Sequence, residues 1–279
     1  MTTCSPQVDV ILCTANRDSA GLAQTLDSLQ HSTLREIRVV LVNDSPCSLP
    51  AGLFPPGLEI HVLNLGVNQG LTKALKAAES CLVAPLVARM DCGDTMDPRR
   101  LALQRAFLLT NEDCVLLGTK SSLLASDGVT QGNLGSSASS DEIQDMHRHL
   151  LWRNPFVHGS IMFRRVDFLA VGGYDASCAI AQDFNLYMRM RQRGRLYILP
   201  DLLYTHRFNL ANSSTVNKNK MSRASSLRSR CALMSFGEFF SPVFIAGALR
   251  DAMLLLLPSG LSRWLHFNRR MQNHEHALD

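Results

Sequence analysis

Apolar and polar residues alternate along the first hundred positions in blocks whose lengths suit strands and helices. Short apolar, β-branched runs predict strands at residues 8–13, 37–42, 58–63 and 81–87. Apolar residues at helical spacing predict helices at residues 20–30, 71–78 and 99–109. Because strands and helices take turns with short connections, we expect an α/β fold with a mostly parallel central sheet and helices on both faces.

The pattern is less regular beyond residue 110. It predicts strands at 114–124, 158–165 and 196–203, and a helix at 181–193. The Gly- and Ser-rich segment 130–140 predicts a mobile loop. Ser139-x-x-Glu142 suits a capping box that opens a helix to about Trp152. Basic and apolar residues mix toward the C-terminus, so we expect an α/β domain at 1–215 and a helical extension at 216–279.

Polar side chains follow three of the predicted strands, at residues 14–17, 43–44 and 89–94. Because crossovers between parallel strands are right-handed, the carboxyl ends of these strands share one edge of the sheet. The last group holds two carboxylates, Asp91 and Asp94, which suit a divalent cation that carries phosphate oxygens. The simpler interpretation of this group is a polar loop that caps the following helix.

Composition narrows the class of protein. The formal net charge is only +4 over 279 residues, and the basic residues are not gathered in a stripe, which argues against nucleic-acid binding. Eight cysteines without a Cys-x-x-Cys pair favour a reducing compartment over a disulfide or zinc framework. Residues 1–7 do not resemble a signal peptide, and no apolar run reaches membrane-spanning length, so we expect a cytoplasmic location.

The C-terminal region mixes arginines with aromatic and aliphatic residues between positions 220 and 270. Two interpretations are open. The region is a helical pair that packs on the α/β domain, or it lies on a membrane surface as a basic amphipathic element. The two can hold together, and the second would place the protein peripherally at the inner face of the cytoplasmic membrane.

Seven short motifs follow one another in order over residues 8–210. They are Cys13-Thr14-Ala15-Asn16-Arg17, Asn43-Asp44-Ser45, Asn68-Gln69-Gly70-Leu71, Ala88 to Pro98, Asn154 to Arg164, Gly172 to Asp175, and Gln182 to Arg189. In this order and spacing they resemble the motifs of the family 2 glycosyltransferases, which have the GT-A fold. Each motif alone is weak, whereas seven in order are specific.

The resemblance implies an inverting enzyme of bacterial polysaccharide synthesis. Such an enzyme moves a sugar from a nucleotide-diphosphate sugar to a hydroxyl of a glycan or lipid-linked acceptor, with the help of Mn²⁺ or Mg²⁺. By position, Asp183 would be the general base. The donor would be bound by Thr14, Asn16, Arg17, Asp44, Asn68, Gly70, Arg89 and Asp91. The metal would be bound by Asp91, Asp94 and His206.

Three positions depart from the pattern of that family. Gly93 stands where the family usually has the aspartate most directly on the metal, Gln182 stands where a glutamate usually precedes the base, and Ala15 replaces a frequent tyrosine. These departures leave open a GT-A-like protein that binds nucleotide without turnover. A nucleotidyltransferase is a further alternative, although the segment after the first strand lacks the glycine loop that a triphosphate requires.

Overall fold

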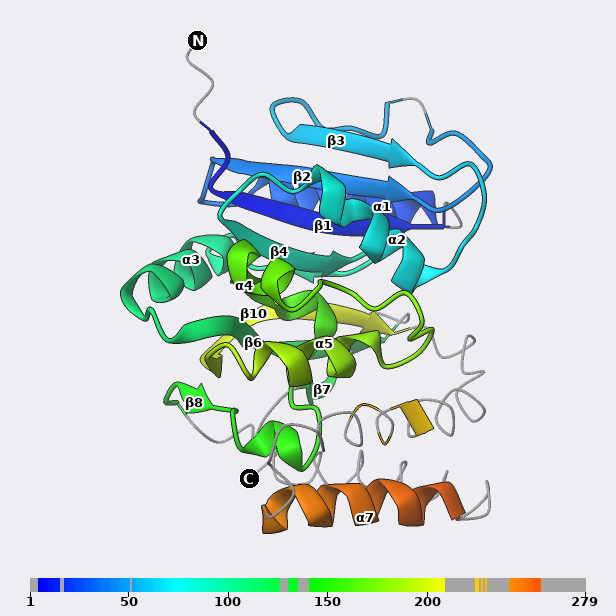
Figure 1. Cartoon of the computed structure of the whole chain (residues 1–279). Coiled ribbons are helices and arrows are strands. Elements are labelled where there is room, and N and C mark those ends of the chain that lie inside the picture. Colours follow the sequence, from blue (N-terminus) through cyan, green and yellow to red (C-terminus); the bar gives the residue numbers. More distant parts are fainter. Residues whose placement is uncertain are drawn as a thin grey trace.

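The structure of the chain is a computed structural model that describes residues 5–15, 18–50, 52–125, 130–134, 141–208 and 241–256, with isolated positions at 224, 225, 227 and 229. Within these residues ten strands form one sheet, in the order β3-β2-β1-β4-β9-β6-β10-β5, with β7 beside β6 and β8 beside β10. Helices cover both faces of this sheet (Figure 1). The α/β expectation is confirmed.

The first half of the sheet is parallel. It consists of β1 (Val8–Thr14), β2 (Ile37–Asn43), β3 (Glu59–Asn64) and β4 (Leu86–Asp91). Strand β1 lies in the centre, and its residues alternate between two buried clusters: Val10 and Leu12 face one, whereas Ile11 and Cys13 face the other. A strand that is buried on both faces requires an unbroken apolar run, which is why the sequence pattern located it well.

The second half of the sheet mixes directions. Strand β9 (Met162–Arg164) runs antiparallel to both β4 and β6 (Cys114–Ala125), and the long β10 (Arg195–Phe208) runs parallel to β6. Three further strands, all antiparallel to their partners, are β5 (Thr95–Met96), β7 (Thr130–Leu134) and β8 (Gln144–Asp145). Because β10 pairs with β5, its carboxyl end is brought beside the turn that follows β4.

Helices α1 (Ser19–Gln30) and α3 (Arg100–Thr110) cover one face of the sheet. Helices α2 (Leu71–Ala78), α4 (Arg165–Ala170) and α5 (Gln182–Met190) cover the other. Short 3₁₀ turns are η1 (Glu79–Cys81), η2 (His149–Leu151) and η3 (His158–Ser160). Helix α7 (Pro242–Leu256) lies beyond η2, at the margin of the molecule (Figure 1). No helix of the described residues is long and apolar enough to cross a bilayer.

Several local predictions were wrong. The strand expected at 81–87 begins only at Leu86 and continues to Asp91, because it pairs in register with β1 from Val8 to Cys13. The helix expected from Glu142 to Trp152 is instead β8 followed by η2, since backbone pairing with β10 outweighs the capping pattern.

Two further segments differ from the prediction. Residues 130–134 of the expected loop form β7, which pairs with β6. The strand expected at 158–165 is divided into η3, the three-residue β9 and the start of α4. The boundary expected at 215/216 lies outside the described residues.

Candidate active site

Four strands end at one edge of the sheet and bring the predicted polar groups together. Thr14 ends β1 and lies in register with Asn43, the last residue of β2. Asp91 ends β4 and lies in register with Cys13 of β1. The carboxyl end of β10 joins them through its contacts with the turn after β4. The convergence expected from right-handed crossovers is therefore confirmed for the described residues.

Arg89 and Asp91 form a buried ion pair at the centre of this edge. The distance from Arg89 Nη2 to Asp91 Oδ1 is 2.5 Å, and Arg89 is only 1% exposed, whereas the Asp91 side chain is 33% exposed. Burial tends to raise the pKa of Asp91, but the nearby charges of Arg89, His158 and His206 outweigh it, and the pKa lies below its usual value. Asp91 therefore presents a carboxylate to the site.

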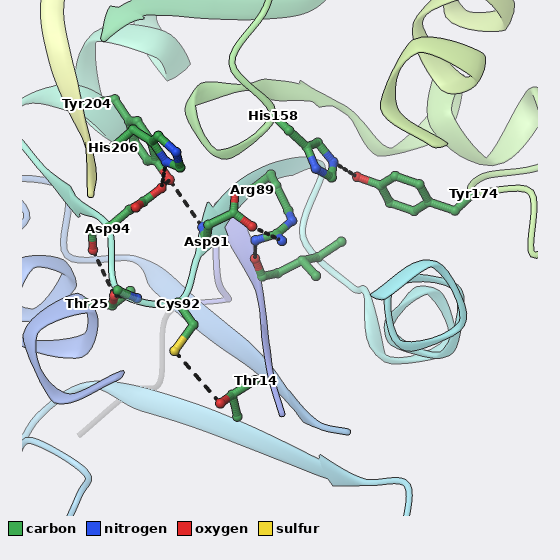
Figure 2. A network of polar contacts seen from close by, with 12 residues as sticks. Thr14, Thr25, Arg89, Asp91, Cys92, Asp94, His158, Tyr174, Tyr204 and His206 are labelled. Atoms are coloured by element: carbon green, nitrogen blue, oxygen red, sulfur yellow. Dashed lines mark hydrogen bonds and ion pairs between the residues drawn. The ribbon is translucent and has the colours of Figure 1, made fainter. Parts of the chain in front are cut away.

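Asp94 behaves differently from Asp91, because the carboxyl end of β10 surrounds it. Its Oδ2 accepts a hydrogen bond from Tyr204 Oη and lies 2.9 Å from His206 Nδ1. Its Oδ1 accepts a hydrogen bond from the backbone N–H of Arg207 at 2.9 Å. Figure 2 shows this carboxylate beside the His206 ring. Both carboxylate oxygens of Asp94 therefore have partners on β10, one of which is the His206 ring.

The turn between Asp91 and Asp94 requires glycine at position 93. Gly93 has φ +96°, a conformation that other residues rarely adopt. Thr25 of α1 fixes the turn, since its hydroxyl accepts a hydrogen bond from Gly93 N at 3.0 Å and donates one to the Asp94 carbonyl at 2.8 Å. A Cβ atom at position 93 would lie 4.0 Å from Asp18 Oδ2. There is thus space at this position, although glycine has no side chain to fill it.

The residues at this edge suit a divalent cation only together with ligands from a bound substrate. Among the described residues, no cluster of three or more His, Cys, Asp or Glu side chains is arranged to hold a metal ion by itself. Asp91 and His206 are nevertheless close enough for the charge of the ring to lower the pKa of the carboxyl. One or two protein ligands completed by phosphate oxygens are the usual arrangement for Mg²⁺.

Asp183 lies in the first turn of α5. Ala181, directly before the helix, has φ 58° and ψ 32°, the left-handed conformation that costs a non-glycine residue about 1–2 kcal/mol. Asn154 Nδ2 donates a hydrogen bond to Asp183 Oδ2 at 2.9 Å, and Asn154 Oδ1 accepts one from Phe156 N at 3.0 Å. A strained backbone and an amide clamp thus fix the direction of this carboxylate.

His158 is close enough to both Asp91 and Asp183 for the two carboxylates to act on the pKa of its ring. Its Nε2 is 2.9 Å from Tyr174 Oη (Figure 2). Burial and the charge of Arg89 lower the pKa of His158 to about 4, although Asp91 and Asp183 act in the opposite direction. The ring is therefore neutral at pH 7. The partner of His158, Tyr174, was not predicted as a site residue, although it lies within the Gly172 to Asp175 motif. Tyr204, which contacts Asp94, was not predicted either.

Asp44 connects β2 to the loop before α2. Its Oδ1 accepts a hydrogen bond from Gln69 N at 2.6 Å, and its Oδ2 accepts one from Gly70 N at 2.9 Å. Asn68 Nδ2 donates to the Asp44 carbonyl at 3.0 Å. Hydrogen bonds thus tie Asn68 and Gly70 to Asp44 at the end of β2, and Thr14 lies at the end of β1, with its Oγ1 3.8 Å from Cys92 Sγ. Two further predicted residues, Asn16 and Arg17, lie outside the described residues.

Comparison with known proteins agrees with this geometry. The family model for Glycosyl transferase family 2 matches residues 9–172. Amylovoran biosynthesis glycosyltransferase AmsE of Erwinia amylovora is 31% identical over 205 residues, which cover 72% of this chain and 74% of that protein. The UDP-Gal:alpha-D-GlcNAc-diphosphoundecaprenol beta-1,3-galactosyltransferase of Escherichia coli is 23% identical, with 68% and 70% covered.

A solved structure resembles the whole fold. It is the mannosyltransferase PcManGT from Pyrobaculum calidifontis in complex with GDP-Man and Mn²⁺. The match has a TM-score of 0.62 and a sequence identity of 14%, and it covers 93% of this chain and 72% of that one. At this identity the likeness concerns the fold.

Proposed function

Because the chain belongs to glycosyltransferase family 2, has the GT-A fold and is a glycosyltransferase, we propose that it transfers its sugar with inversion at the anomeric carbon. The donor is a nucleotide-diphosphate sugar. The acceptor is a hydroxyl of a glycan or lipid-linked precursor of a cell-surface polysaccharide. The names of two relatives, one of amylovoran biosynthesis and one with a diphosphoundecaprenol acceptor, support this choice of acceptor class.

The observation that carries the proposal is the carboxylate of Asp183 in the first turn of α5, which is close enough to His158 to act on the pKa of that ring, as Asp91 also does. Asp183 is held by Asn154 and follows a residue in a strained conformation. An inverting transfer needs one base to remove the proton of the acceptor hydroxyl while the diphosphate leaves on the opposite side. We assign Asp183 Oδ1 to the acceptor, because Asn154 contacts Oδ2.

The metal-side group consists of Asp91 and His206. A Mg²⁺ or Mn²⁺ ion bound there would neutralise the charge that develops on the leaving diphosphate. Arg89 fixes the Asp91 carboxylate by the ion pair of 2.5 Å, and Asp94 fixes the His206 ring through Nδ1. A carboxylate behind a ligating histidine sets its tautomer and orientation. Asp94 thereby contributes to the metal side without touching the ion.

The nucleotide occupies the pocket beside β1 and β2 in this proposal. Thr14 and Asp44 line it from the strand ends, and Asn68 and Gly70 line it from the loop that Asp44 binds. Asn16 and Arg17 complete the set from the segment after β1.

In the same proposal the α/β domain covers residues 1–215 and the extension covers residues 216–279. The protein works on the cytoplasmic side of the membrane.

The test is transfer from a panel of UDP-, GDP- and dTDP-sugars to undecaprenyl-linked and free glycan acceptors. Wild type is compared with the Asp183→Asn variant. The control variant is Asp201→Asn, which makes the same substitution at an exposed position away from the site. We expect turnover by wild type and by the control, loss in Asp183→Asn, and a product of inverted anomeric configuration by NMR. A retained configuration, or an active Asp183→Asn variant, would contradict the proposal.

A further inference from the structure

One face of helix α7 packs against the α/β domain. Phe244 is buried within the same cluster as α2 and α5, and Asp251 is buried as well. The guanidinium of Arg250 lies 4.9 Å from the centre of the Trp152 ring, next to η2, and its Nε donates a hydrogen bond to Asp251 Oδ1 at 3.1 Å. Both charged residues of α7 therefore face inward, where they pair with each other.

The opposite face of α7 is apolar and exposed. Ile245 is 46% exposed, Leu249 65%, Met253 57% and Leu256 86%. These four residues recur every three or four positions, so they form one stripe along the helix. Pro242 and Ala246 lie on the same side and are also exposed. A helix on the surface of a soluble domain normally shows the reverse arrangement, with charges outward and apolar residues inward.

The distribution of charge indicates what covers this stripe. Residues 209–279 carry nine Lys and Arg against four Asp and Glu, a net charge of +5, whereas residues 1–208 carry 19 against 20, a net charge of −1. The basic character of the protein therefore belongs entirely to the part that contains α7. An apolar stripe within a cationic segment is complementary to a surface that is apolar inside and anionic outside.

From these observations we propose that the stripe of Ile245, Leu249, Met253 and Leu256 inserts into the interface of a bilayer that contains anionic phospholipid. The described helix has 15 residues and is about 22 Å long, shorter than the ~30 Å hydrocarbon core, which suits a position along the interface. The basic residues of the extension then meet the lipid phosphates. This inference adds a membrane contact to the proposed function, and it rests on the exposed stripe of α7 and on the charge of residues 209–279.

The test is co-sedimentation of the full chain with vesicles, in the absence of any sugar nucleotide or acceptor. Vesicles of phosphatidylethanolamine and phosphatidylglycerol are compared with vesicles of phosphatidylcholine, at low and high salt. We expect binding to the anionic vesicles that weakens with salt, and a partition coefficient about tenfold lower for Leu249→Glu. Leu109→Glu is the matched control, because Leu109 on α3 is 55% exposed and lies away from α7.

The outcomes separate the possible occupants of the stripe. Equal partitioning of Leu249→Glu and Leu109→Glu would overturn the proposal, as would the absence of wild-type binding. A dimer in sedimentation equilibrium that Leu249→Glu converts to monomer, without vesicle binding, would assign the stripe to a second copy instead. Stronger quenching of the tryptophan fluorescence of Leu249→Trp than of wild type by brominated lipids supplies a second readout of insertion. Since no measurement uses turnover, failure here is distinct from failure of the catalytic proposal.

Discussion

Replacing Asp94 by asparagine tests the proposal that Asp94 orients the ring of His206. The change keeps the shape of the side chain and removes its charge. An asparagine can still accept the backbone N–H of Arg207 through its oxygen. Its amide nitrogen then faces His206 Nδ1, where the carboxylate now lies at 2.9 Å. Because an amide N–H only donates, the ring proton must move from Nδ1 to Nε2.

The size of the effect follows from this change of tautomer. In our proposal Nε2 faces the cation, and a protonated ring nitrogen cannot ligate a metal. Loss of such an outer partner typically lowers metal affinity or activity by about 10- to 100-fold. In free energy this corresponds to about 1.4–2.7 kcal/mol of transition-state stabilisation. The loss should appear in the Mn²⁺ concentration for half-maximal rate.

The assay combines a Mn²⁺ titration of the transfer rate with ¹⁵N NMR of the histidine rings, which reports the tautomer without turnover. Tyr204→Phe is the matched control, because it removes the other hydrogen bond to Asp94 Oδ2 and leaves the pair with His206. We expect the control to keep its Mn²⁺ dependence. A folded Asp94→Asn variant with the wild-type Mn²⁺ dependence and tautomer would refute the reasoning.

Three further predictions concern residues near Asp183. Asn154→Ala should lower kcat by about 10- to 100-fold with little change in KM, because Asp183 loses its clamp; an unchanged kcat in steady-state kinetics would contradict this. Ala181→Gly should stabilise the fold by roughly 0.5–1 kcal/mol in urea unfolding, since glycine adopts φ 58° without strain, and a loss of stability would speak against that strain. Burial holds the pKa of His158 at about 4, below its ordinary 6.5, so the folded chain binds fewer protons than the unfolded chain between these values. The stability contributed by neutral His158 is thus complete above pH 6.5 and is lost as the pH falls toward 4, and His158→Asn should show a flatter pH dependence of unfolding free energy in that window.

The sequence predicted the long strands of the sheet well and the shortest ones poorly, for a physical reason. Strands β1 and β2 are buried on both faces, and a strand in this position has a nearly continuous apolar sequence that is easy to detect. Strands β5, β8 and β9 have only two or three residues and no period to detect. Their place is decided by partners far along the chain, which local patterns do not contain.

The candidate site shows the same limit at the level of single residues. Asp91 and Asp94 are equivalent in the sequence motif, yet one faces the site and the other is surrounded by β10. The difference depends on Tyr204 and His206, which lie more than a hundred positions later. The left-handed backbone of Ala181 also has no sequence signal, because alanine is not the residue that such a conformation favours.

Strand β10 carries His206 just two residues before its last position, Phe208, and the basic extension follows directly. In our two proposals, the metal-side histidine thus lies shortly before the part of the chain that meets the bilayer. If docking of the extension restrains the end of β10, then lipid and metal each stabilise the same backbone. Thermodynamic linkage makes such a coupling reciprocal. Saturating Mn²⁺ and nucleotide would then tighten vesicle binding by the same factor by which vesicles tighten Mn²⁺ binding, and the enzyme would be most active where its lipid-linked acceptor is found.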